Sequence, residues 1–289
     1  MVTLENDFLI VKIKTKGAEL NSAFNKLTKL EYMWSGDPKV WGKTSPVLFP
    51  IVGQLKGNTY LYKDKSWSLP RHGFARDMEF AVDEENKSAV TFSLTDSEMS
   101  LEKYPFQFTL LIEYVLHDDS LQVIYRVRNN DDESMYFSLG AHPAFKVPLI
   151  QGTSYNDYYL QFNHEENFMR WPISPEGTIE IMPYQMQRDK RRINLTKELF
   201  TEDALVFKNL KSDMISIRSD KHGHGLDFGF SKFPFMGIWA APQADFVCIE
   251  PWCGIADSVQ HNQKLEMKEG INLLNKDDLW ERSWKVKFY

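Results

Sequence analysis

Two neighbouring stretches with a two-residue hydrophobic period constrain the fold of this chain most. Residues 106–116 and 121–128 are joined by the short polar segment 117–120, which is typical of a hairpin connection. In the second stretch apolar side chains alternate with polar ones: Leu121, Val123, Tyr125 and Val127 against Gln122, Arg126 and Arg128. Because successive side chains of a strand point to opposite faces, this pattern predicts antiparallel strands with one buried and one wet face.

The rest of the chain continues this β pattern, with short apolar runs between frequent turn signals. An aromatic content of 14% also favours strands over a helical bundle. Residues 96–102 and 197–200 suggest short helices, and alternating apolar side chains in 280–288 indicate a closing strand. We therefore expect an all-β fold, a large antiparallel β-sandwich with few short helices. Since no linker or internal repeat interrupts the pattern, residues 1–289 are expected to form a single domain.

Charge and cysteine content narrow the function. With 34 Lys and Arg against 40 Asp and Glu, the net charge of −6 argues against nucleic-acid binding. The spacing of Cys248 and Cys253 fits neither a redox pair nor a zinc set, and His222 and His224 lack further ligands nearby, so no metal is expected. No basic leader and no apolar run of about 18 residues appear, so we expect a cytoplasmic protein without a membrane association.

The segment 246–254 carries the first candidate site residue. Residues 246–249 are apolar and predict a buried strand, and Pro251 is expected to end it because proline cannot donate to a sheet ladder. Glu250 would then lie rigidly at a strand end, and Trp252 beside it offers a flat apolar face that suits a sugar. The alternative is a structural glutamate that caps a turn or pairs with an arginine.

Other titratable residues occur at similar positions. His142 follows small residues where a strand meets Pro143, and His72 lies between Arg71 and Gly73 in a predicted loop. Asp203 directly precedes an apolar strand. Each has a structural alternative: a satisfied histidine, an exposed basic turn and a turn or capping aspartate, respectively.

Taken together, these residues and the strings around them resemble the aldose 1-epimerase (galactose mutarotase) family, and in particular its LacX-like bacterial branch. The matching strings occur in the family's order between residues 48 and 254: Leu48-Phe49-Pro50-Ile51-Val52-Gly53, Pro70-Arg71-His72-Gly73-Phe74-Ala75-Arg76, Tyr104-Pro105-Phe106, Gly140-Ala141-His142-Pro143-Ala144-Phe145, Asp203-Ala204-Leu205 and Glu250-Pro251-Trp252.

The resemblance implies a mutarotase-type sandwich that interconverts the α and β anomers of an aldose without a cofactor. It implies that Glu250 is the general base and His142 the general acid, and that His72 and Asp203 bind sugar hydroxyls. Ring opening requires such a pair, because one group must take the O1 proton while another protonates the ring oxygen.

One departure from the family affects the expected substrate. Many relatives carry an arginine after the residue that matches Gly53, whereas this chain has Gln54, which can still hydrogen-bond a sugar but has no charge. Some relatives act on hexose 6-phosphates and use an arginine of this loop for the phosphate, and Arg71, Arg76 and Lys56 could supply that charge here. The alternatives are therefore a hexose-6-phosphate 1-epimerase, a carbohydrate-binding protein with weak or no turnover, and a glycoside hydrolase using Glu250 and Asp203. The sequence also leaves open whether the chain forms a homodimer.

Overall fold

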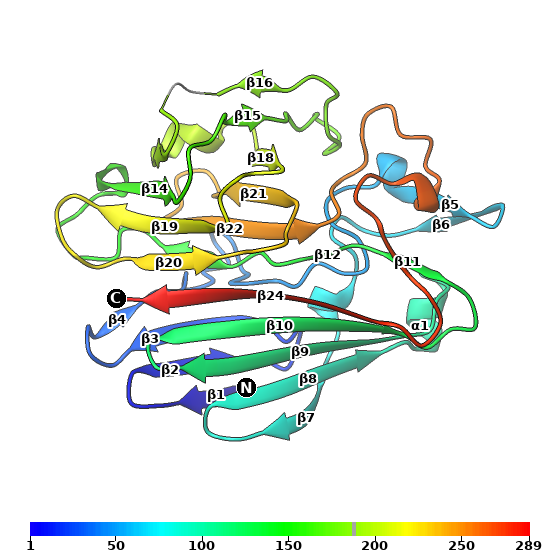
Figure 1. Ribbon diagram of the computed structural model, residues 1–289, viewed down its shortest axis with the longest axis horizontal. Helices are drawn as coiled ribbons and strands as arrows, with labels where there is room; N and C mark the ends of the chain where they lie inside the picture. The colour runs from blue at the N-terminus through cyan, green and yellow to red at the C-terminus, as the bar shows by residue number, and fades with distance from the viewer. Residues whose placement is uncertain (187–188) are drawn as a thin grey trace.

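A computed structural model of the chain describes residues 1–186 and 189–289. Its largest sheet has nine antiparallel strands within these residues (Figure 1). In spatial order they are β17 (Arg192–Asn194), β14 (Tyr158–Phe162), β19 (Met214–Ser219), β20 (Leu226–Gly229), β24 (Leu279–Phe288), β10 (Ser120–Asn129), β9 (Phe108–His117), β8 (Ala89–Thr95) and β7 (Ala81–Glu85).

The predicted hairpin is confirmed as β9 and β10 at the centre of this sheet. Ser120 pairs with His117 across the turn, and the two strands stay in register to Asn129 and Phe108. The alternating apolar side chains of β10 are buried. On its other face Arg126 bonds Glu113 at 2.8 Å and Glu281 at 2.7 Å, so neighbouring strands share one cross-strand charge cluster.

Two smaller antiparallel sheets cover the apolar face of the large sheet, on the side opposite to the Arg126 cluster (Figure 1). The first is formed by β1 (Val2–Glu5), β2 (Leu9–Ile13), β3 (Leu20–Asn25) and β4 (Leu30–Glu31). The second contains β12 (Leu139–Gly140), β13 (Ala144–Lys146), β22 (Phe246–Cys253), β21 (Phe235–Trp239) and β18 (Leu205–Lys208).

Contacts between the layers bury the apolar faces of all three sheets. The Tyr114 hydroxyl of β9 donates to the Ala18 carbonyl at 2.6 Å, and Phe145 of β13 meets Phe228 of β20 with ring centroids 5.7 Å apart. The fold-class prediction, an all-β antiparallel sandwich, is confirmed. A single domain over 1–289 stays a prediction.

Short elements complete the fold. Two-stranded pairs join β5 (Thr59–Tyr62) to β6 (Lys65–Ser68), β11 (Met135–Phe137) to β23 (Asn272–Leu274), and β15 (Met169–Arg170) to β16 (Tyr184–Gln185). The helical turns are α1 (Glu98–Leu101), η1 (Lys56–Asn58), η2 (Ala75–Asp77), η3 (Tyr155–Asp157), η4 (Lys197–Phe200) and η5 (Leu265–Met267). In the described ranges, no helix has the length and apolar character needed to cross a membrane.

The prediction that Pro251 ends its strand is wrong. β22 continues to Cys253, and Pro251 pairs with Met236 of β21. On the other side of β22, the Pro251 carbonyl accepts the Ala141 N–H at 3.1 Å, in the interruption between β12 and β13. The missing N–H of Pro251 therefore faces a break in the neighbouring strand, where no ladder bond is lost. Glu250 consequently lies inside a strand, held on both sides.

Candidate active site

A cavity of about 530 Å³ opens over the sheet that contains β22. The predicted site residues His142, Glu250, His72, Asp203, Arg76 and Trp252 all line it. Its volume lies within the range usual for small-molecule sites. Segments from distant parts of the sequence therefore converge on one concavity, as the sequence strings suggested but could not establish.

The direct contact between Glu250 and His142 is the central feature of this cavity. Glu250 Oε2 lies 3.2 Å from His142 Nε2, and both side chains are buried. Glu250 shares one face of β22 with Trp252 because residues two apart in a strand point the same way. His142 lies in the interruption between β12 and β13, directly beside this strand. The break between β12 and β13 that accommodates Pro251 thus also places the His142 imidazole beside Glu250 of β22.

Burial favours the neutral form of each member of this pair. It raises the pKa of the Glu250 carboxyl well above its usual range, and the nearby Arg71 charge opposes the rise. Burial also lowers the pKa of His142 to about 3, and Arg71 and Arg76 act in the same direction. Around neutral pH the pair therefore holds one proton and no net charge. A single proton shared between two groups is what a reversible acid–base exchange requires.

His72 is fixed as a neutral imidazole of one tautomer. The Gly53 N–H donates to His72 Nδ1 at 3.1 Å, so the ring proton must be on Nε2. Burial lowers the pKa of His72 well below its usual value, and His142, Arg71 and Arg76 add to this. The Arg71 Nε–H is also directed at His72 Nε2, at 3.3 Å, and a neutral imidazole cannot accept at both ring nitrogens. We assign the acceptor role to Nδ1, because its donor is closer and belongs to the fixed backbone.

Two glycines allow the segments around His72 to approach each other. Gly53 and Gly73 have φ values of +72° and +70°. A Cβ on Gly73 would lie 2.2 Å from the Phe49 carbonyl oxygen, and a Cβ on Gly53 would lie 2.5 Å from Ala256 Cβ. Only glycine fits such positions without strain. The strings 48–53 and 70–76 are thus adjacent in space.

Asp203 and the two arginines form the polar part of the cavity wall. Asp203 has a φ of +68°, and its Oδ1 accepts the Ala204 N–H at 2.7 Å. Arg71 Nη2 lies 3.8 Å from Asp203 Oδ2. Arg76 donates to the Arg71 carbonyl at 2.9 Å, while its buried Nε has no hydrogen-bond partner. Arg71, which the sequence offered only as a possible source of charge for a phosphate, therefore pairs with a cavity carboxylate, whereas Arg76 Nε lies 3.7 Å from Asp77 Oδ2.

Trp252 explains the small residues before His142. A Cβ on Gly140 would lie 2.6 Å from Trp252 Cδ1, and a Cβ on Gly237 would lie 2.3 Å from Trp252 Cζ2. The space beside the Gly140-Ala141 pair is thus filled by this indole. The Trp252 N–H is buried at the cavity wall outside hydrogen-bond geometry, but it is close enough to Glu250 to act against the rise in the pKa of that carboxyl.

Two aromatic residues of the site were missed from the sequence. Trp41 stacks on the His142 ring with centroids 5.1 Å apart, and Trp239 meets the same ring edge-on at 5.8 Å. Both line the cavity. Trp239 was within reach of sequence reasoning, because it ends the aromatic-rich strand before β22. Trp41 comes from a loop between Gly36 and Thr44 whose course no periodic pattern predicts.

Gln54 does not line the cavity. Its side-chain amide donates to the Leu55 carbonyl at 3.3 Å and also to the Asn58 side chain. A Cβ added to Gly177, a residue of the cavity wall, would lie 3.2 Å from the Gln54 Cβ, so Gln54 lies next to that wall. Direct sugar binding by Gln54 stays a prediction that requires the amide to turn away from Asn58.

In the part of the chain that the structure describes, one group of side chains has ligand types and spacing suited to a metal ion. The ligand atoms of His142, Cys248 and Glu250 lie within 4.8 Å of one another. Cys248 does not line the cavity, and burial raises the pKa of its thiol well above its usual value. A metal would first have to displace that proton. His222, the other candidate ligand considered, lies 2.9 Å from the Tyr158 hydroxyl. A metal-free site stays a prediction.

Together, the antiparallel sandwich and the cavity residues define a protein of the galactose mutarotase type. The chain belongs to the aldose 1-epimerase family, whose model matches residues 1–271. It is 33% identical to the LacX proteins, plasmid and chromosomal, of Lactococcus lactis subsp. lactis over 294 residues, which cover 99% of this chain and 98% of each relative.

Solved structures agree with this assignment. A galactose mutarotase related enzyme from Lactobacillus acidophilus superposes with a TM-score of 0.94 at 34% identity, covering 100% of this chain and 97% of that one. A galactose mutarotase-like protein from Lactobacillus casei also has a TM-score of 0.94, at 32% identity and 100% coverage of both chains. The resemblance inferred from the sequence strings is confirmed.

Proposed function

We propose that this chain is an aldose 1-epimerase that interconverts the α and β anomers of a hexose, with Glu250 and His142 as the acid–base pair. The observation that carries this proposal is the 3.2 Å contact between Glu250 Oε2 and His142 Nε2 in a cavity of sugar size. The pair holds one proton, and family membership supplies the reaction class.

The reaction moves two protons and breaks one bond. With the shared proton on His142, the Glu250 carboxylate takes the proton of the O1 hydroxyl, and His142 gives its proton to the ring oxygen. The bond between C1 and the ring oxygen breaks, and O1 becomes the aldehyde oxygen. Rotation about the bond between C1 and C2 presents the other carbonyl face, and ring closure returns both protons. Because O1 and the ring oxygen are both bonded to C1, two groups in mutual contact can serve both.

The remaining cavity residues suit a sugar. Trp41, which also stacks on His142 and Phe246, and Trp239 line the cavity and provide apolar surface against which a pyranose ring can pack. The His72 Nε2–H and the Asp203 carboxylate provide a donor and an acceptor for hydroxyl groups. Binding that is directed by these few polar groups would hold C1 beside the acid–base pair.

Polarimetry of freshly dissolved α-D-glucose and α-D-galactose tests this proposal. The wild type should accelerate mutarotation, and Glu250→Gln should lower kcat by about 10²–10⁴-fold, the usual contribution of one positioned proton transfer. Glu166→Gln is the matched control, because Glu166 is also a buried carboxylate but binds the Ser212 N–H away from the cavity. Equal activity of wild type and Glu250→Gln would contradict the assignment of the base.

A specific observation favours a second substrate class, hexose 6-phosphates. Arg71 and Arg76 both line the cavity, and the buried Arg76 Nε makes no hydrogen bond, its ion pair with Asp77 Oδ2 being 3.7 Å long. Anomer exchange of glucose 6-phosphate, followed by NMR, distinguishes the classes. Arg76→Gln should lower kcat/KM for the phosphorylated sugar alone if the phosphate is bound there. Saturable sugar binding without any acceleration would instead indicate a binding protein, and cleavage of aryl glycosides a hydrolase.

A further inference from the structure

A fully buried ion pair lies beneath the cavity wall, outside the acid–base machinery. Lys268 Nζ donates to Asp257 Oδ1 at 2.8 Å, and their side chains are 1% and 0% exposed. His261 Nδ1 lies 3.3 Å from Asp257 Oδ2, which also accepts the Lys56 N–H at 2.9 Å. Burying both charges has a high desolvation cost, so the pair is not explained by stability alone and a positional role is worth testing.

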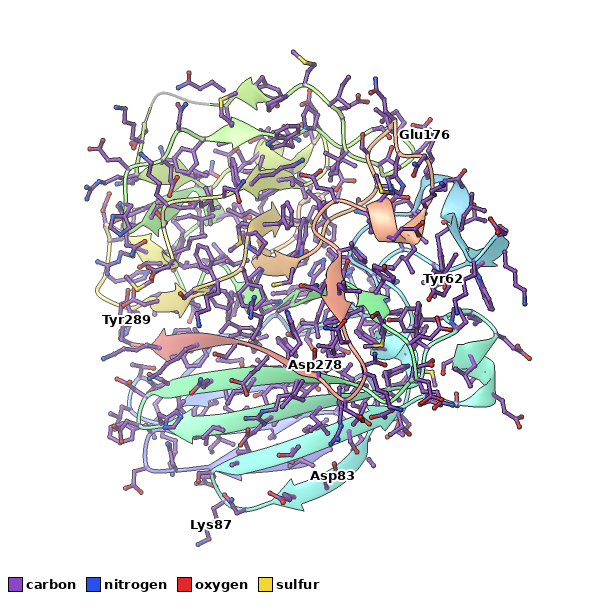
Figure 2. The ribbon with its side chains drawn as sticks, turned by 45° about the vertical axis from the view of Figure 1, so that its right-hand side comes forward. Tyr62, Asp83, Lys87, Glu176, Asp278 and Tyr289 are labelled. Carbon is purple, nitrogen blue, oxygen red and sulfur yellow. The ribbon has the colours of Figure 1, made fainter. Side chains whose placement is uncertain are left out.

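Asp257 connects three segments that lie beside the cavity. Its N–H donates to the Gln54 carbonyl at 2.8 Å, and its carbonyl accepts the Ile179 N–H at 2.8 Å. Figure 2 labels Glu176 at the tip of the 173–179 turn, and an isolated bridge joins Ile179 to Ser258 after β22. The side chain and the backbone of one residue thus fix residues 54–56, 179 and 257 relative to one another.

These contacts lead directly to His72. Gly53, next to Gln54, packs so closely on Ala256, next to Asp257, that a Cβ would lie 2.5 Å from Ala256 Cβ. Gly53 then holds His72 twice: its N–H donates to Nδ1 at 3.1 Å, and its carbonyl accepts the His72 N–H at 2.9 Å. Any shift of Asp257 would therefore move the donor that selects the His72 tautomer.

We propose that Asp257, held in place by Lys268, is a positioning residue that fixes the ring orientation and the Nε2–H tautomer of His72. The pKa of Asp257 agrees with a permanent charge: burial acts to raise it, but His261 and Lys268 bring it down to about 2. The expected effect on kcat rests on the proposed function, whereas the tautomer of His72 can be measured without any turnover.

The test compares the charge-free double variant Asp257→Asn with Lys268→Met against a surface control. Removing both charges avoids leaving one buried charge unpaired, so the variant is expected to fold. The control removes the exposed pair formed by Lys276 and Asp132, 2.6 Å apart, with the same two types of substitution. Readouts are thermal unfolding, the ¹⁵N shifts of the His72 ring assigned with His72→Asn, and kcat and KM for the sugar.

In the wild type and the control, His72 Nδ1 should have the shift of an unprotonated acceptor nitrogen. In the buried double variant the shifts of Nδ1 and Nε2 should converge as tautomers mix, and kcat should fall about tenfold with a smaller change in KM, the scale of one misplaced hydrogen bond. Unchanged ring shifts, or unchanged kcat with altered shifts, would overturn the proposal. So would a wild-type His72 protonated on Nδ1, a measurement that needs no variant. A wild type without turnover but with the expected tautomer would contradict the proposed function alone.

Discussion

Replacing Gly73 with alanine should destabilise the protein far more than the same replacement at Gly152. Both glycines have left-handed backbones, with φ of +70° and +85°. Each replacement therefore costs about 1–2 kcal/mol of backbone strain. The lower entropy of the unfolded alanine chain offsets roughly 0.4–1 kcal/mol of this. The two sites differ in their surroundings alone, which makes Gly152 a matched control.

At Gly152 no heavy atom lies within 4 Å of an added Cβ, so only the net backbone cost of up to about 1.5 kcal/mol remains. At Gly73 the Cβ would lie 2.2 Å from the Phe49 carbonyl oxygen. That oxygen accepts the N–H groups of Phe74 and Ala75 at 3.0 and 3.1 Å. Moving it away weakens two buried hydrogen bonds, each worth about 1–3 kcal/mol when left unsatisfied. The total for Gly73→Ala is therefore roughly 2–7 kcal/mol.

Urea unfolding at neutral pH measures this difference directly. Gly223→Ala serves as a second control, since Gly223 has open space and no left-handed φ and should lose less than about 1 kcal/mol. If Gly73→Ala lost no more than about 1 kcal/mol beyond Gly152→Ala, the close approach of segments 48–53 and 70–76 would not require glycine at position 73.

Three further predictions follow from the site. Because burial holds the pKa of His142 at about 3 and raises that of Glu250, the single-proton state should persist through neutral pH. Accordingly, kcat/KM corrected for spontaneous mutarotation should show no step near 6.5, the ordinary pKa of a histidine. The pKa of Asp257 is lowered from 3.8 to about 2, so its carboxylate contributes stability that is complete above the unfolded value and is lost as the pH falls towards 2. The stability lead of wild type in urea over the double variant Asp257→Asn with Lys268→Met should therefore be constant from about pH 7 to 5 and shrink by roughly 2 kcal/mol below pH 4. Trp41→Ala should raise KM about 3–10-fold through the lost aromatic face, whereas Trp41→Phe should stay within about twofold of wild type.

The strand pattern could be predicted because it depends on local periodicity. The alternation in residues 121–128 and the turn at 117–120 specify β9 and β10 almost residue by residue. The extent of β22 could not be predicted, because the cost of a proline depends on the neighbouring strand. At Pro251 that neighbour is interrupted between β12 and β13, a fact of tertiary structure that no local rule contains.

The site could be predicted in part for a similar reason. Glu250 and His142 were selected because titratable residues next to buried strands are costly unless they have a role. Trp41 was missed because it belongs to an irregular loop and reaches His142 only through the fold. Gln54 was included because many relatives in the family carry a sugar-contacting arginine at that position, but its side chain here bonds Asn58. Sequence neighbours therefore indicate which segments meet, while side-chain direction requires the tertiary structure.

The most direct test of the central claim is NMR magnetisation transfer between the α and β anomers of an equilibrated sugar. At equilibrium no net reaction occurs, so exchange between the two anomeric signals reports ring opening and closure alone. We predict that wild-type protein accelerates this exchange for glucose or galactose, and that Glu250→Gln and His142→Asn each abolish the acceleration. Acceleration that survives both substitutions would contradict the acid–base role of the Glu250–His142 pair.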